Sequence, residues 1–102
     1  MPGFGNPFAG MKAPRMLTRE ELIRSVRMMV AAEYEAVQMY MQLAESTDAK
    51  LAKDVLADIA DEELVHAGEF LRLLKELAPD EEKFYKKGYG EVEDILKKKP
   101  KK

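Results

Sequence analysis

Residues 48–78, DAKLAKDVLADIADEELVHAGEFLRLLKELA, decide the fold of this chain. Apolar residues recur along the stretch at alternating spacings of three and four, which is the pattern of an amphipathic α-helix. Pro79 follows directly, and because proline disfavours the helical conformation in the residue before it, we expect the helix to end at about Ala78. The stripe that we expect to face inward is Val55, Ile59, Glu63, His66, Phe70, Leu73 and Leu77.

A second helical pattern precedes this one. Thr18 and Glu21 have the spacing of a capping box, which predicts a helix start, and nothing breaks the helix before about Ser46. Thr47 and Asp48 then offer a turn and a fresh N-cap, so the sequence predicts two long antiparallel helices joined by a tight turn. The inward stripe of this first helix is Leu22, Val26, Met29, Glu33, Ala36, Tyr40 and Leu43.

The segments on either side are shorter. We interpret residues 1–16 as a flexible arm, residues 17–99 as one helical domain and residues 100–102 as a basic tail. After Pro79 we expect Asp80 to cap a short third helix that Gly88 and Gly90 end, followed by an amphipathic piece over 91–99. The lysine-rich end KKKPKK (97–102) is interpreted as a solvated tail, with an anchor for an acidic surface as the alternative.

Apolar residues spread over more than one stripe of each long helix. A two-helix hairpin buries only one stripe per helix, so a wider apolar surface predicts obligate association. The simplest closure is a homodimer that forms an all-α four-helix bundle. On the first helix the methionines Met28, Met29, Met39 and Met41 point several ways, and on the second Leu56, Leu64, Leu71 and Leu74 lie beyond the main stripe.

Composition excludes several classes of function. The chain has 102 residues, 17 basic and 19 acidic, with a net charge of −2, so it is one domain and we expect no nucleic-acid partner. The absence of cysteine removes disulfides, iron–sulfur clusters, thiolate zinc sites and cysteine nucleophiles. We expect no membrane span and a cytoplasmic location, because no run of 18 apolar residues and no signal-like segment occurs.

Three titratable residues interrupt the two inward stripes: Glu33, Glu63 and His66. Glu33 lies 14 residues before Thr47 and Glu63 lies 16 after it, so their heights along the hairpin differ by about 3 Å. His66 shares the face of Glu63, since positions i and i+3 are neighbours on a helix. Each chain then supplies half of a site, and two chains supply four carboxylates and two imidazoles. This is the ligand set of di-iron bundles, with manganese as the alternative metal.

Other interpretations of these residues stay open. A lone Glu-x-x-His is common in helices, and Glu33 could pair with His66 as a buried polar latch that fixes register. Tyr40 lies two turns after Glu33, where it could bond to a metal ligand or quench a radical, or be an ordinary core tyrosine. Glu35 and Glu62 flank the ligands and point away from the seam, as solvated side chains or as carboxylates at a metal entrance.

Three segments resemble one known family. EYEAVQMY (33–40), ESTDAKL (45–51) and DEELVHAGE (61–69) are similar to the encapsulated ferritin-like proteins and, more distantly, to the ferritin-like domain of rubrerythrins; the resemblance covers residues 18–78. It implies a half-ferritin of two long helices and a shorter C-terminal helix. Dimers of such chains build a ferroxidase centre between subunits, and the dimers form rings inside encapsulin shells.

The resemblance also implies roles for individual residues. Glu33, Glu63 and His66 take the positions of the iron ligands, Tyr40 that of a tyrosine near the centre, and Glu35 that of a glutamate at the metal entrance. The chain departs from the family at Ala32, where some members have a second entrance acid, and at Met39, where some have tryptophan. It also ends without the Gly/Leu/Ile-rich targeting tail of the family.

The expected function is therefore oxidation of Fe(II) to Fe(III) for iron storage or detoxification, within an encapsulin shell. Glu33, Glu63, His66 and Tyr40 are the candidate catalytic residues. One alternative is a di-iron peroxidase or oxidase like rubrerythrin. Another, from a different class, is a metal-free helical dimerisation or adaptor module.

Overall fold

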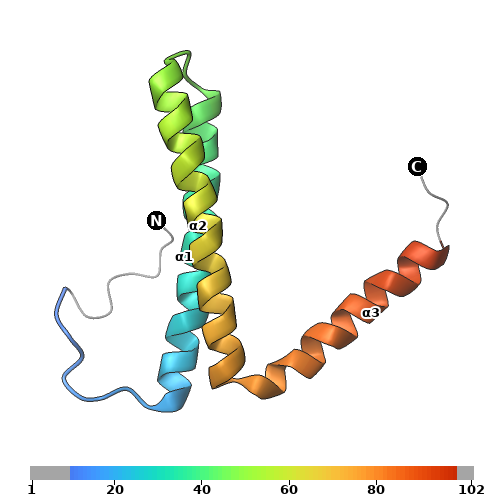
Figure 1. Ribbon diagram of the computed structural model, residues 1–102. Helices are drawn as coiled ribbons and strands as arrows, with labels where there is room; N and C mark the ends of the chain where they lie inside the picture. Colours follow the sequence, from blue (N-terminus) through green and yellow to red (C-terminus); the bar gives the residue numbers. More distant parts are fainter. Residues whose placement is uncertain (1–9, 99–102) are drawn as a thin grey trace.

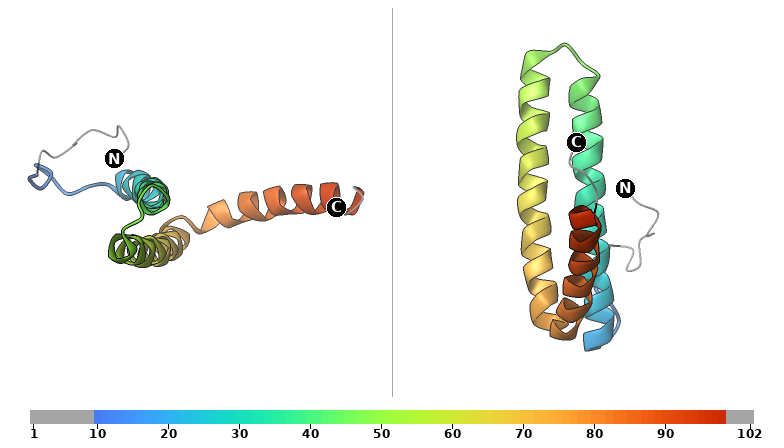
Figure 2. Two further views of the ribbon diagram at one scale, coloured as in Figure 1. Left: turned by 90° about the horizontal axis from the view of Figure 1, so that it is seen from above. Right: turned by 90° about the vertical axis from the view of Figure 1, so that its right-hand side faces the viewer.

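The computed structural model describes residues 10–98, and these residues form an all-helical chain. The elements are α1 (Arg19–Glu45), α2 (Lys50–Leu77), the short 3-10 turn η1 (Pro79–Glu81) and α3 (Glu82–Lys98). Helices α1 and α2 lie side by side as an antiparallel hairpin, and α3 projects away from its open end (Figures 1 and 2). The predicted hairpin is confirmed, whereas the expectations for residues 1–9 and 99–102 lie outside the described residues.

The start of α1 follows from its capping box. The Thr18 hydroxyl accepts a hydrogen bond from the Glu21 amide at 3.1 Å, and the Glu21 carboxylate accepts one from the Thr18 amide at 2.9 Å. Arg15 adds two bonds of 2.7 Å to the same carboxylate. The hydrogen bond from Arg15, and after it the one from the Thr18 amide, lowers the pKa of Glu21 to about 2. The predicted helix start is confirmed.

The turn between the long helices differs from the prediction in one detail. Helix α2 begins two residues later than expected, and its N-cap is Ala49, which makes no side-chain cap bond; Asp48 is therefore not the cap. Thr47 instead accepts a hydrogen bond from the Ala49 amide at 3.1 Å. The ammonium group of Lys53 donates to the Ala44 carbonyl at 3.0 Å, which satisfies an oxygen at the end of α1.

The seam inside the hairpin is built around small residues, which corrects the predicted stripes. Ala60, Ala67 and Leu74 recur every seven residues along α2 and are all buried, although the sequence placed Leu74 outside the main seam. Val26 is buried as predicted, and Phe70 and Leu77 pack against the buried cluster. Alanines let two helices approach closely, and other large members of the predicted stripes lie exposed beside the seam instead of in it. We call these exposed members the open flank: Leu22, Met29, Leu43, Val55 and Leu73. The buried residues of α1 are Ile23, Val26, Ala32 and Ala44.

The prediction for the third helix was wrong. Gly88 and Gly90 do not end a helix: α3 runs unbroken for 17 residues, and Asp80 lies in η1 instead of capping a helix. Neither glycine has a positive φ, so neither needs the left-handed conformation that makes glycine a helix terminator. Helix α3 buries none of its residues in the chain, and its apolar side chains Phe84, Tyr89, Val92, Ile95 and Leu96 are exposed.

No helix within residues 10–98 is long and apolar enough to cross a membrane.

Candidate metal centre

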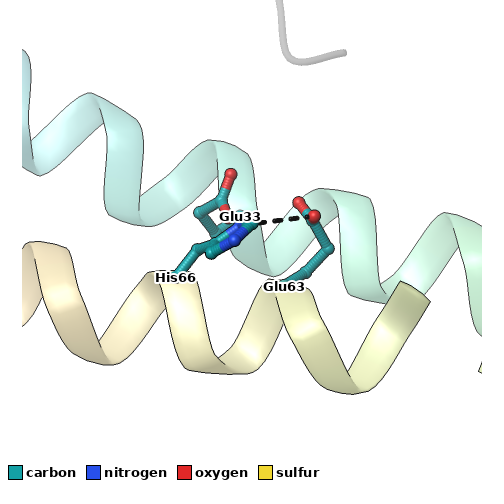
Figure 3. A group of neighbouring side chains, drawn as sticks. All are labelled: Glu33, Glu63 and His66. Atoms are coloured by element: carbon teal, nitrogen blue, oxygen red, sulfur yellow. Dashed lines mark hydrogen bonds and ion pairs between the residues drawn. The ribbon is translucent and has the colours of Figure 1, made fainter. Parts of the chain in front are cut away.

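Three side chains meet across the middle of the hairpin. Glu33 comes from α1, and Glu63 and His66 come from successive turns of α2; Figure 3 shows the three side chains turned towards one another. The Nδ1 atom of His66 lies 3.1 Å from a Glu33 carboxylate oxygen and 3.5 Å from one of Glu63. One ligand atom from each residue lies within 4.8 Å of the other two. The matched heights that the sequence predicts are thus realised in space.

The three residues differ in exposure. The side chains of Glu33 and Glu63 are 18% and 17% exposed, whereas that of His66 is 50% exposed. The carboxylates therefore lie at the edge of the hairpin seam, and the imidazole of His66 extends beside the open flank. The residues of the open flank belong to the same helical stripes as Glu33, Glu63 and His66. A site that is buried on one side and open on the other is the geometry expected of half a site.

The chemistry of the donor atoms suits a hard divalent transition metal. Carboxylate oxygens favour magnesium, calcium, manganese and iron, and imidazole nitrogen restricts the choice towards transition metals such as iron. Among the described residues, this is the only group of three or more acidic, histidine or cysteine side chains close enough to hold one ion. The Nδ1 atom of His66 is the nitrogen that faces both carboxylates, so it is the atom that fits a metal held between them.

The contact between His66 and Glu33 is also the one that a polar latch would make. Such a latch needs one carboxylate and one imidazole, and it leaves Glu63 unexplained. A second carboxylate within 4.8 Å adds like-charge repulsion that a single imidazole does not remove. The donor set therefore exceeds what a structural latch requires.

The neighbouring candidates fall into two groups. Tyr40 is partly buried on α1 and makes no hydrogen bond to the three-residue cluster within the described part of the chain; with Glu35, Ala36 and Met39 it lines an open hollow of about 150 Å³. Glu35 is partly buried, with one carboxylate oxygen shielded from solvent, so it is not the solvated side chain that its position on the helix also allowed. Glu62 is exposed on α2, as expected.

Comparison with known proteins identifies the family of this chain and several of its relatives. The family model for rubrerythrin matches residues 26–101. The chain is 36% identical over 78 residues to a ferritin-like–encapsulin shell fusion protein of Pyrococcus furiosus, and 38% identical over 76 residues to the encapsulin nanocompartment cargo protein EncC of Myxococcus xanthus. The crystal structure of the encapsulated ferritin domain from Pyrococcus furiosus has a TM-score of 0.81 and 32% identity, with 93% of this chain and 96% of that chain covered.

The two curated relatives are longer than the matching region. The matches cover 76% and 74% of this chain but only 23% of the fusion protein and 58% of the cargo protein. The chain therefore spans less than two thirds of the length of each of these curated relatives.

Proposed function

Because the chain belongs to the rubrerythrin family of ferritin-like proteins, we propose that it is a ferroxidase whose di-iron centre forms between two copies. Each copy contributes Glu33, Glu63 and His66. The observation that carries this proposal is the convergence of these three side chains within 4.8 Å at the edge of the open flank. A twofold axis beside that flank would bring together four carboxylates and two imidazoles, which is the ligand set of di-iron carboxylate bundles.

Fe(II) is the substrate in this proposal. Each Fe(II) loses one electron, dioxygen or hydrogen peroxide is the electron acceptor, and Fe(III) leaves for mineralisation. Glu33 and Glu63 provide negative charge that favours the more highly charged product, and His66 provides the neutral nitrogen ligand. The hairpin holds the carboxylates partly out of water, which strengthens their interaction with a cation. Tyr40, two turns from Glu33, is proposed as a nearby redox-active or hydrogen-bonding group.

The ferroxidase proposal is tested by oxygen consumption and Fe(III) formation after anaerobic addition of Fe(II). Glu63→Ala and His66→Ala should each abolish iron-dependent oxygen consumption and two-iron binding. Glu69→Ala, which removes an exposed carboxylate one turn further along α2, should retain both. Full activity in the Glu63 and His66 variants would exclude this site, and absence of stoichiometric iron or manganese from the purified protein would favour the metal-free adaptor.

The rubrerythrin match supports a second candidate, a di-iron peroxidase. The same residues would then use hydrogen peroxide as the acceptor and require an external reductant to return the metals to the divalent state. Single-turnover oxidation rates with oxygen and with peroxide separate the two functions. A large preference for peroxide, together with turnover driven by a reductase, would identify the peroxidase.

We further propose that the chain works as cargo of an encapsulin shell, which would place it inside a nanocompartment in the cytoplasm. Both curated relatives are named for encapsulin: one is an encapsulin nanocompartment cargo protein, and the other is a fusion of a ferritin-like part with an encapsulin shell. Co-expression with an encapsulin shell protein, followed by gradient sedimentation, should bring the chain into the shell fraction. Sedimentation of the chain at its own size in that experiment would contradict this part of the proposal.

A further inference from the structure

The junction between the hairpin and α3 holds an ion-pair network that the proposed function does not use. Arg27, on α1, donates from Nε to the Glu81 carboxylate at 3.0 Å, and its Nη2 donates to the same oxygen. The hydroxyl of Tyr85, on the first turn of α3, donates to the other Glu81 oxygen at 2.9 Å. One carboxylate in the turn thus joins α1 to α3.

A further contact fixes the end of α2 to α1. Arg19 donates from Nη2 to the Leu77 carbonyl at 2.7 Å, directly before the turn. Arg19 and Arg27 are two turns apart on α1, so the two arginines hold the chain on both sides of Ala78 and Pro79. The turn is therefore attached to the first helix at two points.

Apolar packing reaches the start of this turn, where Leu77 and Ala78 lie against the buried cluster of Ile23, Val26 and Leu74, but it does not extend into α3, which buries none of its residues. An open hollow of about 310 Å³ separates the turn from the start of α1, with Ile23, Leu77 and Pro79 among its lining residues. Helix α3 projects away from both long helices (Figure 1 and the left view of Figure 2). Because α3 itself has no buried residue, the polar contacts of Glu81 are the interactions that link its first turn to α1.

We propose that Arg27, Glu81 and Tyr85 form a hinge clamp that sets the angle between α3 and the hairpin and keeps α3 from folding back onto its own hairpin. The need for such a clamp follows from the surfaces on either side of the hinge. Helix α3 exposes Tyr89, Val92 and Leu96 along one stripe, and the hairpin exposes an apolar open flank. An unrestrained hinge would let these surfaces bury each other within one chain.

The contacts of Glu81 also shift the pKa values of the groups that form the clamp. The Arg27 hydrogen bond, followed by that of Tyr85, lowers the pKa of Glu81, and the contact with Glu81 raises the pKa of the Tyr85 hydroxyl. A carboxylate that accepts a guanidinium and a phenol together has a defined position, because both of its oxygens are committed. Rotation of α3 about the hinge must break one of these bonds.

The angle can be measured directly because the chain contains no cysteine. Spin labels are attached at Lys50→Cys, at the hairpin tip, and at Lys97→Cys, near the end of α3, and labelled chains are diluted with unlabelled chains so that only distances within one chain are recorded. Helix α3 is roughly 25 Å long, so a rotation of 20° moves its far end by about 9 Å. A change of this size is well resolved by pulsed electron spin resonance.

We expect one narrow distance in the parent protein and a broader, shorter distribution in Arg27→Met and Glu81→Gln. Tyr85→Phe, which removes one hydroxyl, should broaden the distribution less. Arg24→Met, a change to an exposed arginine one turn away on α1, is the matched control and should leave the distance unchanged. The exchanged pair Arg27→Glu with Glu81→Arg should restore a narrow distribution, which a merely destabilised hairpin would not do.

Circular dichroism on each variant reports whether the hairpin is folded. A broad distribution in the parent protein would overturn the proposal. An unchanged narrow distance in both Arg27→Met and Glu81→Gln would overturn it as well, because association between chains, and not the clamp, would then set the direction of α3.

Discussion

Replacing Glu63 with glutamine is expected to stabilise the metal-free protein and to remove most of its stabilisation by metal. The carboxylates of Glu33 and Glu63 contribute oxygens within 4.8 Å of each other. Two unit charges at about 4.8 Å repel by about 3.5 kcal/mol at an effective dielectric constant of 20 and by about 1 kcal/mol in water. Since the site is half open and His66 offsets part of the repulsion, we expect a gain of about 1 kcal/mol, or a rise in Tm of roughly 4–8 °C.

The measurement is thermal unfolding in chelator and in Mn(II), which binds without the oxidation that Fe(II) undergoes. In the parent protein, metal at about a hundred times its Kd should add about 2.7 kcal/mol to the free energy of unfolding. Glu63→Gln should lose most of that gain while starting from a higher Tm in chelator. Glu69→Gln, on the exposed face of α2, should change neither value.

The same experiment distinguishes the metal centre from the polar latch. If the three residues serve only as a latch, Glu63→Gln weakens a contact to His66 and lowers the Tm in chelator, and Mn(II) has no effect on either protein. That pair of results would refute the reasoning. A metal site holds carboxylates close together, and their repulsion is expected to lower the stability of the protein when no cation is bound. The prediction for Glu63→Gln tests this trade-off between stability and function.

Three further predictions concern the scaffold. Leu74→Ala, at a side chain that is 5% exposed in the cluster with Ile23, should cost about 3 kcal/mol, measured as a lower urea midpoint. Gly88→Ala should raise the helicity of α3 and stabilise it by about 0.5–1 kcal/mol, seen by circular dichroism, because a Cβ there meets nothing within 4 Å. The folded pKa of Glu21, about 2, lies below its ordinary value of 4.5, so its contribution is present above pH 4.5 and is lost as the pH falls towards 2. Arg15→Ala should reduce that loss in acid titrations of stability.

Local signals in the sequence predicted the two long helices well. The Thr18–Glu21 capping box and Pro79 mark two helix boundaries through bonds or clashes within four residues, so no tertiary information is needed. The convergence of Glu33 with Glu63 was predictable for a similar reason. Once a tight turn joins two straight helices, the rise per residue determines which residues face each other.

The sequence could not assign each apolar stripe to a partner. Periodicity shows that an arc of a helix is apolar, but the arc is the same whether it packs on its own chain or on another. The alanines at 60 and 67 carry a weak hydrophobic signal and yet form the hairpin seam, because their small size permits close approach. The Arg27–Glu81 contact joins residues 54 positions apart and leaves no periodic trace.

The position of the alanine seam has a consequence for how the site is proposed to work. Because the hairpin closes on small residues, Glu33 and Glu63 lie at the border of the seam, partly buried, and His66 extends onto the open flank. The exposed apolar side chains of the open flank share the helical stripes of Glu33, Glu63 and His66. A second chain that covers Met29 and Leu73 must therefore also cover His66, so burial of apolar surface and completion of the ligand set use the same face. If a twofold axis lies beside this face, metal binding and subunit association are linked through one interface. Bound metal should then strengthen the association of two chains, and association should raise the affinity for metal.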